Sequence, residues 1–106
     1  MARPETADVF RAIADPTRRG LLSLLVAGET PVGRLATSFD MSLPAISQHL
    51  RVLREVGLVA EHRVGRERRY RLQPASLKEV ATWVTQFEQF WNLKLDALDR
   101  HLREQP

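Results

Sequence analysis

The chain has no cysteine, and this absence excludes several kinds of protein. Without thiols there is no disulfide framework, no thiolate metal site and no cysteine nucleophile. No stretch approaches the ~18 consecutive apolar residues of a membrane-spanning helix, and the first residues lack the apolar segment of a secretion signal. We therefore expect a soluble, cytoplasmic protein that does not associate with membranes.

Motifs for catalysis are also lacking. The 106 residues contain no Gly-rich phosphate loop, no plausible Ser/His/Asp set and no credible metal cluster, and the carboxylates are scattered among arginines. We expect no enzymatic activity, no cofactor and no bound metal. A chain of this length is expected to form one domain, residues 1–106, which association with a second copy would stabilise further.

The positive charge that the chain does carry is concentrated in its middle. Residues 1–41 hold five basic and five acidic side chains, residues 42–72 hold seven and three, and residues 73–106 hold four and five. Fourteen of the sixteen basic residues are arginine, whose planar guanidinium suits phosphates and the guanine edge. This distribution indicates a polyanionic partner for the middle segment.

Capping residues, prolines and glycines predict four successive helices. Each helix is preceded by a Ser, Thr or Asp that can accept a hydrogen bond from the first turn. A residue before proline is pushed away from the helical conformation, so Asp15-Pro16 separates the first two helices. The predicted caps are Thr6, Asp15, Thr30 and Ser42, and the predicted stops of the second and fourth helices are Gly28 and Gly57.

A β-hairpin and a long final helix are predicted to follow. Residues 58–64 and 68–72 have the composition of two antiparallel strands around a glycine-containing turn. Ser76 and Glu79 form a capping box for a helix that runs to about Arg103. The fold class is therefore mainly α with a small β-hairpin, in the order helix-helix-helix-helix-hairpin-helix.

The fourth helix is predicted to present a reading surface. Ile46, Leu50 and Leu53 repeat at the spacing of one helix face and must lie against a core. The other side carries small and hydrogen-bonding side chains, which can enter a major groove of DNA and touch base edges. These candidate DNA contacts are Pro44, Ala45, Ser47, Gln48 and Arg51, with Ser42 both capping the helix and donating to a phosphate.

The hairpin adds five arginines within nine residues. They are either a solubilising surface or, the interpretation that we favour, contacts to the DNA backbone, with Arg66 or Arg68 at the tip dipping into the minor groove. The arginines assigned to DNA are Arg63, Arg66, Arg68 and Arg69.

Two further positions are candidate DNA contacts. His49 lies between the inner and outer faces of the fourth helix, so it is either half-buried packing or an edge contact. Arg18 and Arg19 stand at the start of the second helix, where cations oppose the helix dipole. That unfavourable position indicates a phosphate contact, which we assign to Arg18.

The final helix carries an apolar stripe. A helix of roughly 40 Å, at about 1.5 Å per residue, overhangs any core that so small a domain can build. The same helix of a second copy would bury this stripe, and its aromatic residues could also line a small-molecule pocket. The stripe repeats at Leu77, Ala81, Val84, Glu88, Trp91, Leu95, Leu98 and Leu102, and it is widened by Trp83, Phe87 and Phe90.

Several of these motifs, in this order, resemble the ArsR family of bacterial winged helix-turn-helix repressors. The resemblance covers roughly residues 8–72, about two thirds of the chain. It rests on Ala14-Asp15-Pro16-Thr17-Arg18-Arg19, on the segment from Met41 to Leu53, on Gly57-Leu58-Val59, and on Gly65-Arg66 with Tyr70-Arg71-Leu72.

The resemblance implies a homodimer that represses an operon and releases DNA when it binds a metal or another signal. It also implies that the first and last helices build the dimer interface. The interface residues expected are Val9, Phe10, Ile13, Trp83, Val84, Phe87, Phe90, Trp91, Leu95, Leu98 and Leu102.

The sequence departs from the metal-sensing members of this family. The Cys-x-Cys pair of the founding sensors is missing. The C-terminal metal site of another subgroup needs two separate motifs, and here the single histidine of Asp99-Arg100-His101 would have to serve in both. Phe90-Trp91 instead resembles a cysteine-free subgroup. We therefore expect no metal and leave the inducing signal, such as a small-molecule effector, open.

Two functions remain. The first is a homodimeric DNA-binding repressor, associated with the nucleoid, whose operator is an imperfect inverted repeat of double-stranded DNA with half-sites roughly 34 Å apart. The second is a winged-helix protein-interaction or RNA-binding module. That module should have an aromatic or acidic outer face on the fourth helix, and Ala45, Ser47 and Gln48 disfavour it.

Overall fold

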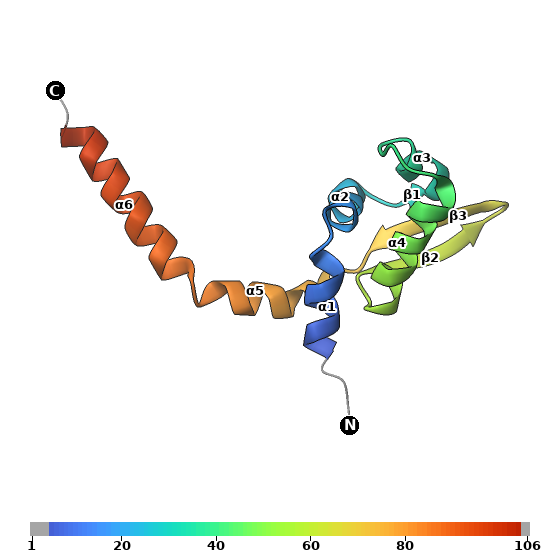
Figure 1. Cartoon of the computed structure of the whole chain (residues 1–106), viewed down its shortest axis with the longest axis horizontal. Coiled ribbons are helices and arrows are strands. Elements are labelled where there is room, and N and C mark those ends of the chain that lie inside the picture. Colours follow the sequence, from blue (N-terminus) through green and yellow to red (C-terminus); the bar gives the residue numbers. More distant parts are fainter. Residues whose placement is uncertain (1–4, 105–106) are drawn as a thin grey trace.

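The computed structural model describes residues 5–104, which fold into a helical body, a small sheet and a projecting C-terminal arm (Figure 1). The expected winged helix-turn-helix fold, mainly α with a β-hairpin, is confirmed. The elements are α1 Glu5–Ile13, α2 Pro16–Leu25, β1 Thr30–Pro31, α3 Val32–Ala36, α4 Leu43–Glu55, β2 Val59–Val64, β3 Glu67–Leu72, the 3₁₀ turn η1 Pro74–Leu77, α5 Lys78–Thr85 and α6 Glu88–Glu104. Across the described ranges, no helix is both long enough and apolar enough to cross a bilayer.

Two helix caps form as the sequence predicts. The Asp15 carboxylate accepts a hydrogen bond from the backbone N–H of Arg18 at 3.0 Å, and the Ser42 Oγ accepts one from the N–H of Ala45 at 3.3 Å. A proline lies in the first turn of both α2 and α4. Gly57 follows α4 with φ of 81°, a left-handed conformation that ends the helix without the strain that a Cβ would bring.

The start of α3 differs from the prediction. Thr30 does not cap a helix; its Oγ1 donates to the carbonyl of Gly28 at 2.9 Å. Thr30 and Pro31 form β1, which pairs with β3 in an antiparallel sheet of order β1-β3-β2 within the described residues. A cap motif depends only on neighbouring residues, whereas this pairing needs a strand forty residues away, so the tertiary contact overrides the local signal. At the other end of the helical body, Thr6 lies inside α1, which already includes Glu5.

The prediction of a single final helix is wrong, because the structure has η1, α5 and α6 there. Ser76 belongs to η1, and its Oγ donates to the carbonyl of Gly57 at 3.3 Å instead of forming a capping box. The helix then breaks after Thr85, because the Thr85 hydroxyl and the Gln86 amide bond to helix carbonyls and the Phe87 N–H bonds to Val84, three residues back. As a result α6 leaves α5 at an angle (Figure 1).

The core lies where α1, α2, α3 and α4 meet the base of the sheet. The predicted inner face of α4 is confirmed, because Ile46, Leu50 and Leu53 are each fully buried. Tyr70 of β3 is 2% exposed and extends the core under the hairpin. Burial of such side chains stabilises the fold by about 1.5–3 kcal/mol each, so α4 is held rigidly and its other face is turned outward.

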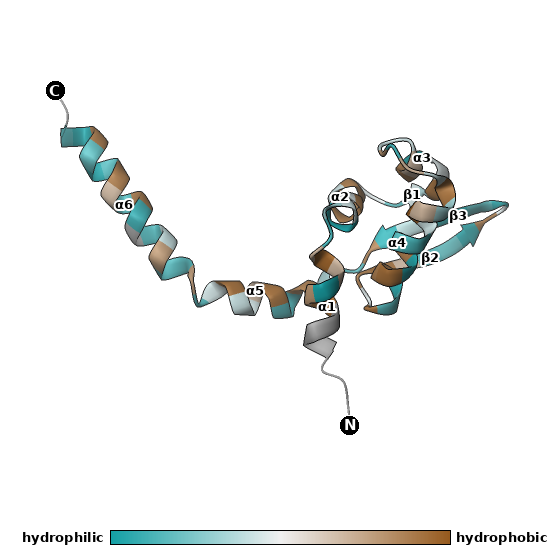
Figure 2. Ribbon diagram, in the orientation of Figure 1, coloured by the Kyte–Doolittle hydropathy of each residue, from teal (hydrophilic) through white to brown (hydrophobic). Residues whose placement is uncertain are grey.

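The chain as a whole is far from spherical. Its radius of gyration is 18.2 Å, compared with about 13 Å for a compact chain of this length. The excess comes from α5 and α6, which extend away from the body (Figure 1). Apolar positions recur along α6 among hydrophilic ones (Figure 2), and the exposed fractions of Trp91, Leu95, Leu98 and Leu102 range from 52% to 62%.

Candidate nucleic-acid interface

The outward face of α4 is available for a partner. Pro44 and Gln48 are exposed, and Ala45 and Ser47 are half-buried beside them. The amide of Gln48 has no hydrogen-bond partner among the described residues, so both its donor and its acceptor are free for a base edge. Arg51, one turn deeper, is exposed and forms an i,i+4 ion pair with Glu55 at 3.2 Å.

The hairpin of β2 and β3 forms the wing. Its two strands turn at Gly65 and Arg66, and Gly65 adopts φ of 63°. Arg63 and Arg68 lie directly opposite each other in the register, a pairing of like charges that destabilises a sheet. Both therefore face the same side, where the Arg68 Nη2 donates to the Ser47 Oγ of α4 at 3.1 Å.

A groove of about 510 Å³ lies between the wing and the starts of α3 and α4. Its walls carry four arginines and one acidic residue, so it is strongly basic. The lining residues are Pro31, Val32, Gly33, Arg34, Leu43, Arg63, Arg66, Glu67 and Arg68. Arg34 is not among the contacts predicted from the sequence, because nothing along the chain indicates that α3 lies against the wing.

A polar network behind this groove holds the wing on α4. The Tyr70 hydroxyl donates to Glu61 Oε2 at 2.5 Å, and Glu61 also forms ion pairs with Arg54 of α4 at 3.2 Å and with Arg68 at 3.8 Å. Burial, with the adjacent Glu61 carboxylate, raises the pKa of Tyr70 to about 12. The network fixes the angle between the wing and α4.

Arg18 connects α1, α2 and α4 through hydrogen bonds of its guanidinium group. Its Nε donates to the carbonyl of Ala12 at 2.6 Å, its Nη2 to the carbonyl of Arg11 at 3.2 Å, and its Nη1 lies 3.2 Å from His49 Nδ1. A guanidinium can only donate, so this contact is a hydrogen bond when His49 is neutral and carries its proton on Nε2. His49 thus packs between helices and is half-buried. This corresponds to the first of the two roles expected for it from the sequence.

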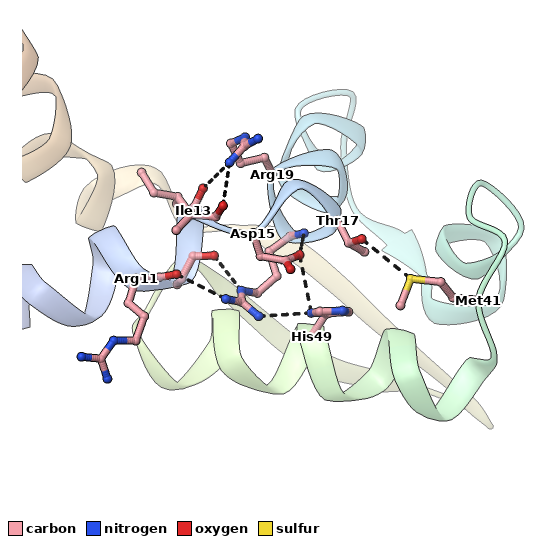
Figure 3. Close-up of polar contacts among 10 residues, drawn as sticks. Arg11, Ile13, Asp15, Thr17, Arg19, Met41 and His49 are labelled. Carbon is pink, nitrogen blue, oxygen red and sulfur yellow. Dashed lines mark hydrogen bonds and ion pairs between the residues drawn. The ribbon is translucent and has the colours of Figure 1, made fainter.

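The arginines at the start of α2 have a structural explanation. Arg19 Nη1 donates to the carbonyls of Ile13 at 2.9 Å and Ala14 at 3.0 Å, as Arg18 does to the preceding pair (Figure 3). Both cations therefore lie at the C-terminal end of α1, where unpaired carbonyls and the helix dipole favour positive charge. The unfavourable position within α2 does not by itself indicate a phosphate, and a phosphate contact by Arg18 stays a prediction.

Asp15 completes this junction. Its carboxylate lies 3.9 Å from His49 Nδ1. The hydrogen bond from the Arg18 backbone N–H lowers the pKa of Asp15 below its ordinary value, and the charges of His49 and Arg18 act in the same direction against partial burial.

Comparison with known proteins places this geometry in a family. Residues 15–61 match the model of the bacterial regulatory proteins of the arsR family. The chain is 39% identical over 80 residues to the transcriptional repressor SdpR of Bacillus subtilis (strain 168), an alignment that covers 76% of this chain and 89% of that protein.

The chain belongs to the ArsR family.

Solved structures of ArsR regulators agree with this assignment. The crystal structure of one ArsR family transcriptional regulator superposes with a TM-score of 0.73 at 33% identity, over 87% of this chain and 97% of that one. A homodimeric winged helix-turn-helix DNA-binding domain from Mycobacterium bovis, Mb0332, superposes with a TM-score of 0.66 at 31% identity, over 81% and 82%. This ArsR-family chain is accordingly a transcriptional regulator with a winged helix-turn-helix DNA-binding fold.

The structure brings most of the predicted DNA-contacting residues of this ArsR chain to one side. The candidates on α4 lie next to Arg63, Arg66 and Arg68 of the wing. Arg69 does not join them. It occupies the other face of β3, where it pairs with Glu67 at 2.9 Å and lies 4.0 Å from Glu29. The alternation of side chains along a strand separates Arg69 from Arg68, and DNA contacts by the individual residues remain predictions.

Some of the predicted interface residues pack within the chain itself, and others are exposed. Val9 is only 4% exposed and belongs to the core of the chain itself, which corrects its assignment to the interface. Phe10 packs edge-on against Trp83 with ring centroids 5.5 Å apart, and Trp83 packs against Phe87 at 5.1 Å. The predicted interface residues of α6 are exposed, namely Phe90, Trp91, Leu95, Leu98 and Leu102.

The histidine motif near the C-terminus is part of a charged helix. Asp99 forms an i,i+4 ion pair with Arg103 at 3.0 Å. In the part of the chain that the structure describes, no three His, Asp or Glu side chains lie close enough together to hold a metal ion.

Proposed function

We propose that this ArsR-family chain is a homodimeric transcriptional repressor that reads an imperfect inverted-repeat operator. The observation that carries the proposal is the outer face of α4, where the free amide of Gln48 stands among small side chains next to a basic wing. In this arrangement α4 lies in the major groove, Gln48 contacts an adenine or a phosphate, and the wing holds the backbone. The relative SdpR is named a transcriptional repressor.

The dimer is supported by the exposed stripe on α6. Trp91, Leu95 and Leu98 are all more than half exposed and follow one another at helical spacing. An apolar face of this kind in a helix of about 26 Å, at about 1.5 Å per residue, needs a partner. A second copy related by a two-fold axis supplies an identical face, and it places two recognition helices on successive turns of DNA. The related Mb0332 domain is homodimeric.

The proposal assigns the chain no catalytic reaction. A regulator that reads a bacterial operator works where the chromosome is, so we place it in the cytoplasm with the nucleoid. Exposed Phe90 and Trp91 also leave room for an effector of low polarity at the helical arm.

Sedimentation and operator binding test the dimer together. The operator is obtained by selecting duplexes from a random pool on the wild-type protein. Trp91→Glu should yield monomers or aggregates and should weaken operator binding more than the loss of any single wing arginine, because one half-site supplies too few contacts. Asn92→Glu places the same carboxylate on an adjacent exposed position outside the stripe and should remain dimeric.

A wild-type chain that sediments as a 12.1 kDa monomer yet binds its operator tightly would contradict the dimer. Equal affinity for duplex DNA, single-stranded DNA and RNA would contradict operator reading.

A further inference from the structure

We propose that the basic groove between the wing and the starts of α3 and α4 is a pocket for one phosphodiester of the DNA backbone, with Arg34 of α3 as its anchor. This inference rests on the proposed function and deepens it, because it assigns one backbone phosphate to this groove and to Arg34. From the sequence we expect the wing arginines to contact the DNA backbone, with Arg66 or Arg68 at the tip in the minor groove, and Arg34 has no role in that prediction.

The charge of the groove is unbalanced. Among the side chains that the structure describes, no ion pair joins Arg34, Arg63 or Arg66 to an acidic residue. The one acidic residue of the lining, Glu67, is already neutralised by Arg69, whose Nε and Nη2 lie 3.1 and 2.9 Å from the same carboxylate oxygen. The groove therefore presents several free guanidinium groups and no free carboxylate.

The pairing of the strands also favours an anion here. Arg63 and Arg68 are direct cross-strand partners, and two like charges in that position repel. Arg68 is held in place by Ser47 at 3.1 Å and by Glu61 at 3.8 Å, so it cannot turn away from Arg63 without losing both contacts. A phosphate between the two guanidinium groups would convert the repulsion into two attractive interactions.

The position of the groove selects a phosphodiester of the bound duplex over other anions. Leu43, the first residue of α4, lines the groove, so a duplex that receives α4 in its major groove brings its own backbone past this opening. Pro31, Val32 and Leu43 supply apolar walls, next to which a charge-assisted hydrogen bond is stronger than in open water. A backbone phosphate held here also sets the depth of α4.

The test compares Arg34→Ala with Arg71→Ala. Arg71 is an exposed arginine on the other face of β3, opposite Ala60, so its substitution removes the same charge from the wing without touching the groove. For Arg34→Ala and Arg63→Ala we expect weaker binding to the selected operator and to random duplex alike. The slope of log affinity against log salt should fall by about one for each substitution. Arg71→Ala should leave the slope unchanged, and circular dichroism should show all three variants folded.

The contact is located by neutralising single phosphates with methylphosphonate. At one position on each half-site, neutralisation should lower the operator affinity of the wild type. The same modification should not lower the affinity of Arg34→Ala any further. Equal slopes for Arg34→Ala and Arg71→Ala, with no such position, would overturn the inference while leaving the proposed function intact. A wild-type chain that binds no duplex would overturn both.

Inorganic phosphate is the second possible source of the same chemistry. At constant ionic strength, replacing chloride by phosphate should release no more DNA from the wild type than from Arg34→Ala. A saturable release that Arg34→Ala abolishes would show that the groove takes the free ion, and it would refute the backbone contact.

Discussion

Arg18→Ala tests whether the junction of α1, α2 and α4 depends on one guanidinium. The substitution removes the donors to the carbonyls of Ala12 at 2.6 Å and Arg11 at 3.2 Å, and to His49 Nδ1 at 3.2 Å. A hydrogen bond from a charged donor contributes about 1.5–3 kcal/mol, and we place the short bond to Ala12 at the lower end because Arg18 is half-buried. The two longer bonds add about 0.5 kcal/mol each.

The free energy of unfolding should therefore fall by about 2.5 kcal/mol. In a domain of this size that corresponds to a fall in Tm of about 10–20 °C. Urea denaturation and thermal melting followed by circular dichroism measure both quantities. Arg11→Ala is the matched control: its side chain is exposed and points away from the junction (Figure 3), so its loss should change the free energy by about 0.5 kcal/mol or less.

The same variant separates the structural role of Arg18 from a phosphate contact. Loss of the junction should weaken operator binding at 25 °C without changing the salt dependence, because α4 is displaced but no phosphate partner is removed. A slope that falls by about one would instead assign Arg18 to the DNA. If Arg18→Ala proved as stable as Arg11→Ala, the reasoning from the three hydrogen bonds would be refuted.

Three further predictions follow from the interface. Gln48→Ala should mainly narrow the difference in affinity between operator and random duplex, measured by fluorescence anisotropy, and an equal loss on both would remove its reading role. Tyr70 has a raised pKa of about 12 and is the single tyrosine of the chain, so tyrosinate absorbance should report its ionisation directly. Because the folded pKa lies above the unfolded value of about 10, this contribution to stability is complete below pH 10 and is lost as the pH rises toward 12. Tyr70→Phe should remove that pH dependence, and unchanged alkaline denaturation would contradict the assignment. Zinc, nickel, cobalt or arsenite at modest excess should not release a fluorescent operator, and a chelator-reversible release that His101→Ala abolishes would overturn this expectation.

Local patterns in the sequence were sufficient to predict much of the helical body. Asp15 and Ser42 cap their helices because the capping hydrogen bond is made within one turn. Ile46, Leu50 and Leu53 are buried because their spacing alone determines that they share a face. The motifs around these residues also indicated the family, since they lie in short continuous segments.

Contacts between distant segments decided the rest. Thr30 has the sequence features of a helix cap, but it pairs with Tyr70 in the sheet. The position of Arg18 at the start of α2 suggested a phosphate contact, but its hydrogen bonds to the carbonyls of α1 also explain that position. The break after Thr85 depends on side-chain hydrogen bonds that compete with the helix and that periodicity does not detect. Arg34 joins the basic groove only because α3 folds against the wing. Spacing along a chain specifies which residues share a face, but the partner that each face meets is determined by the packing of elements far apart in sequence, and only the tertiary structure contains that information.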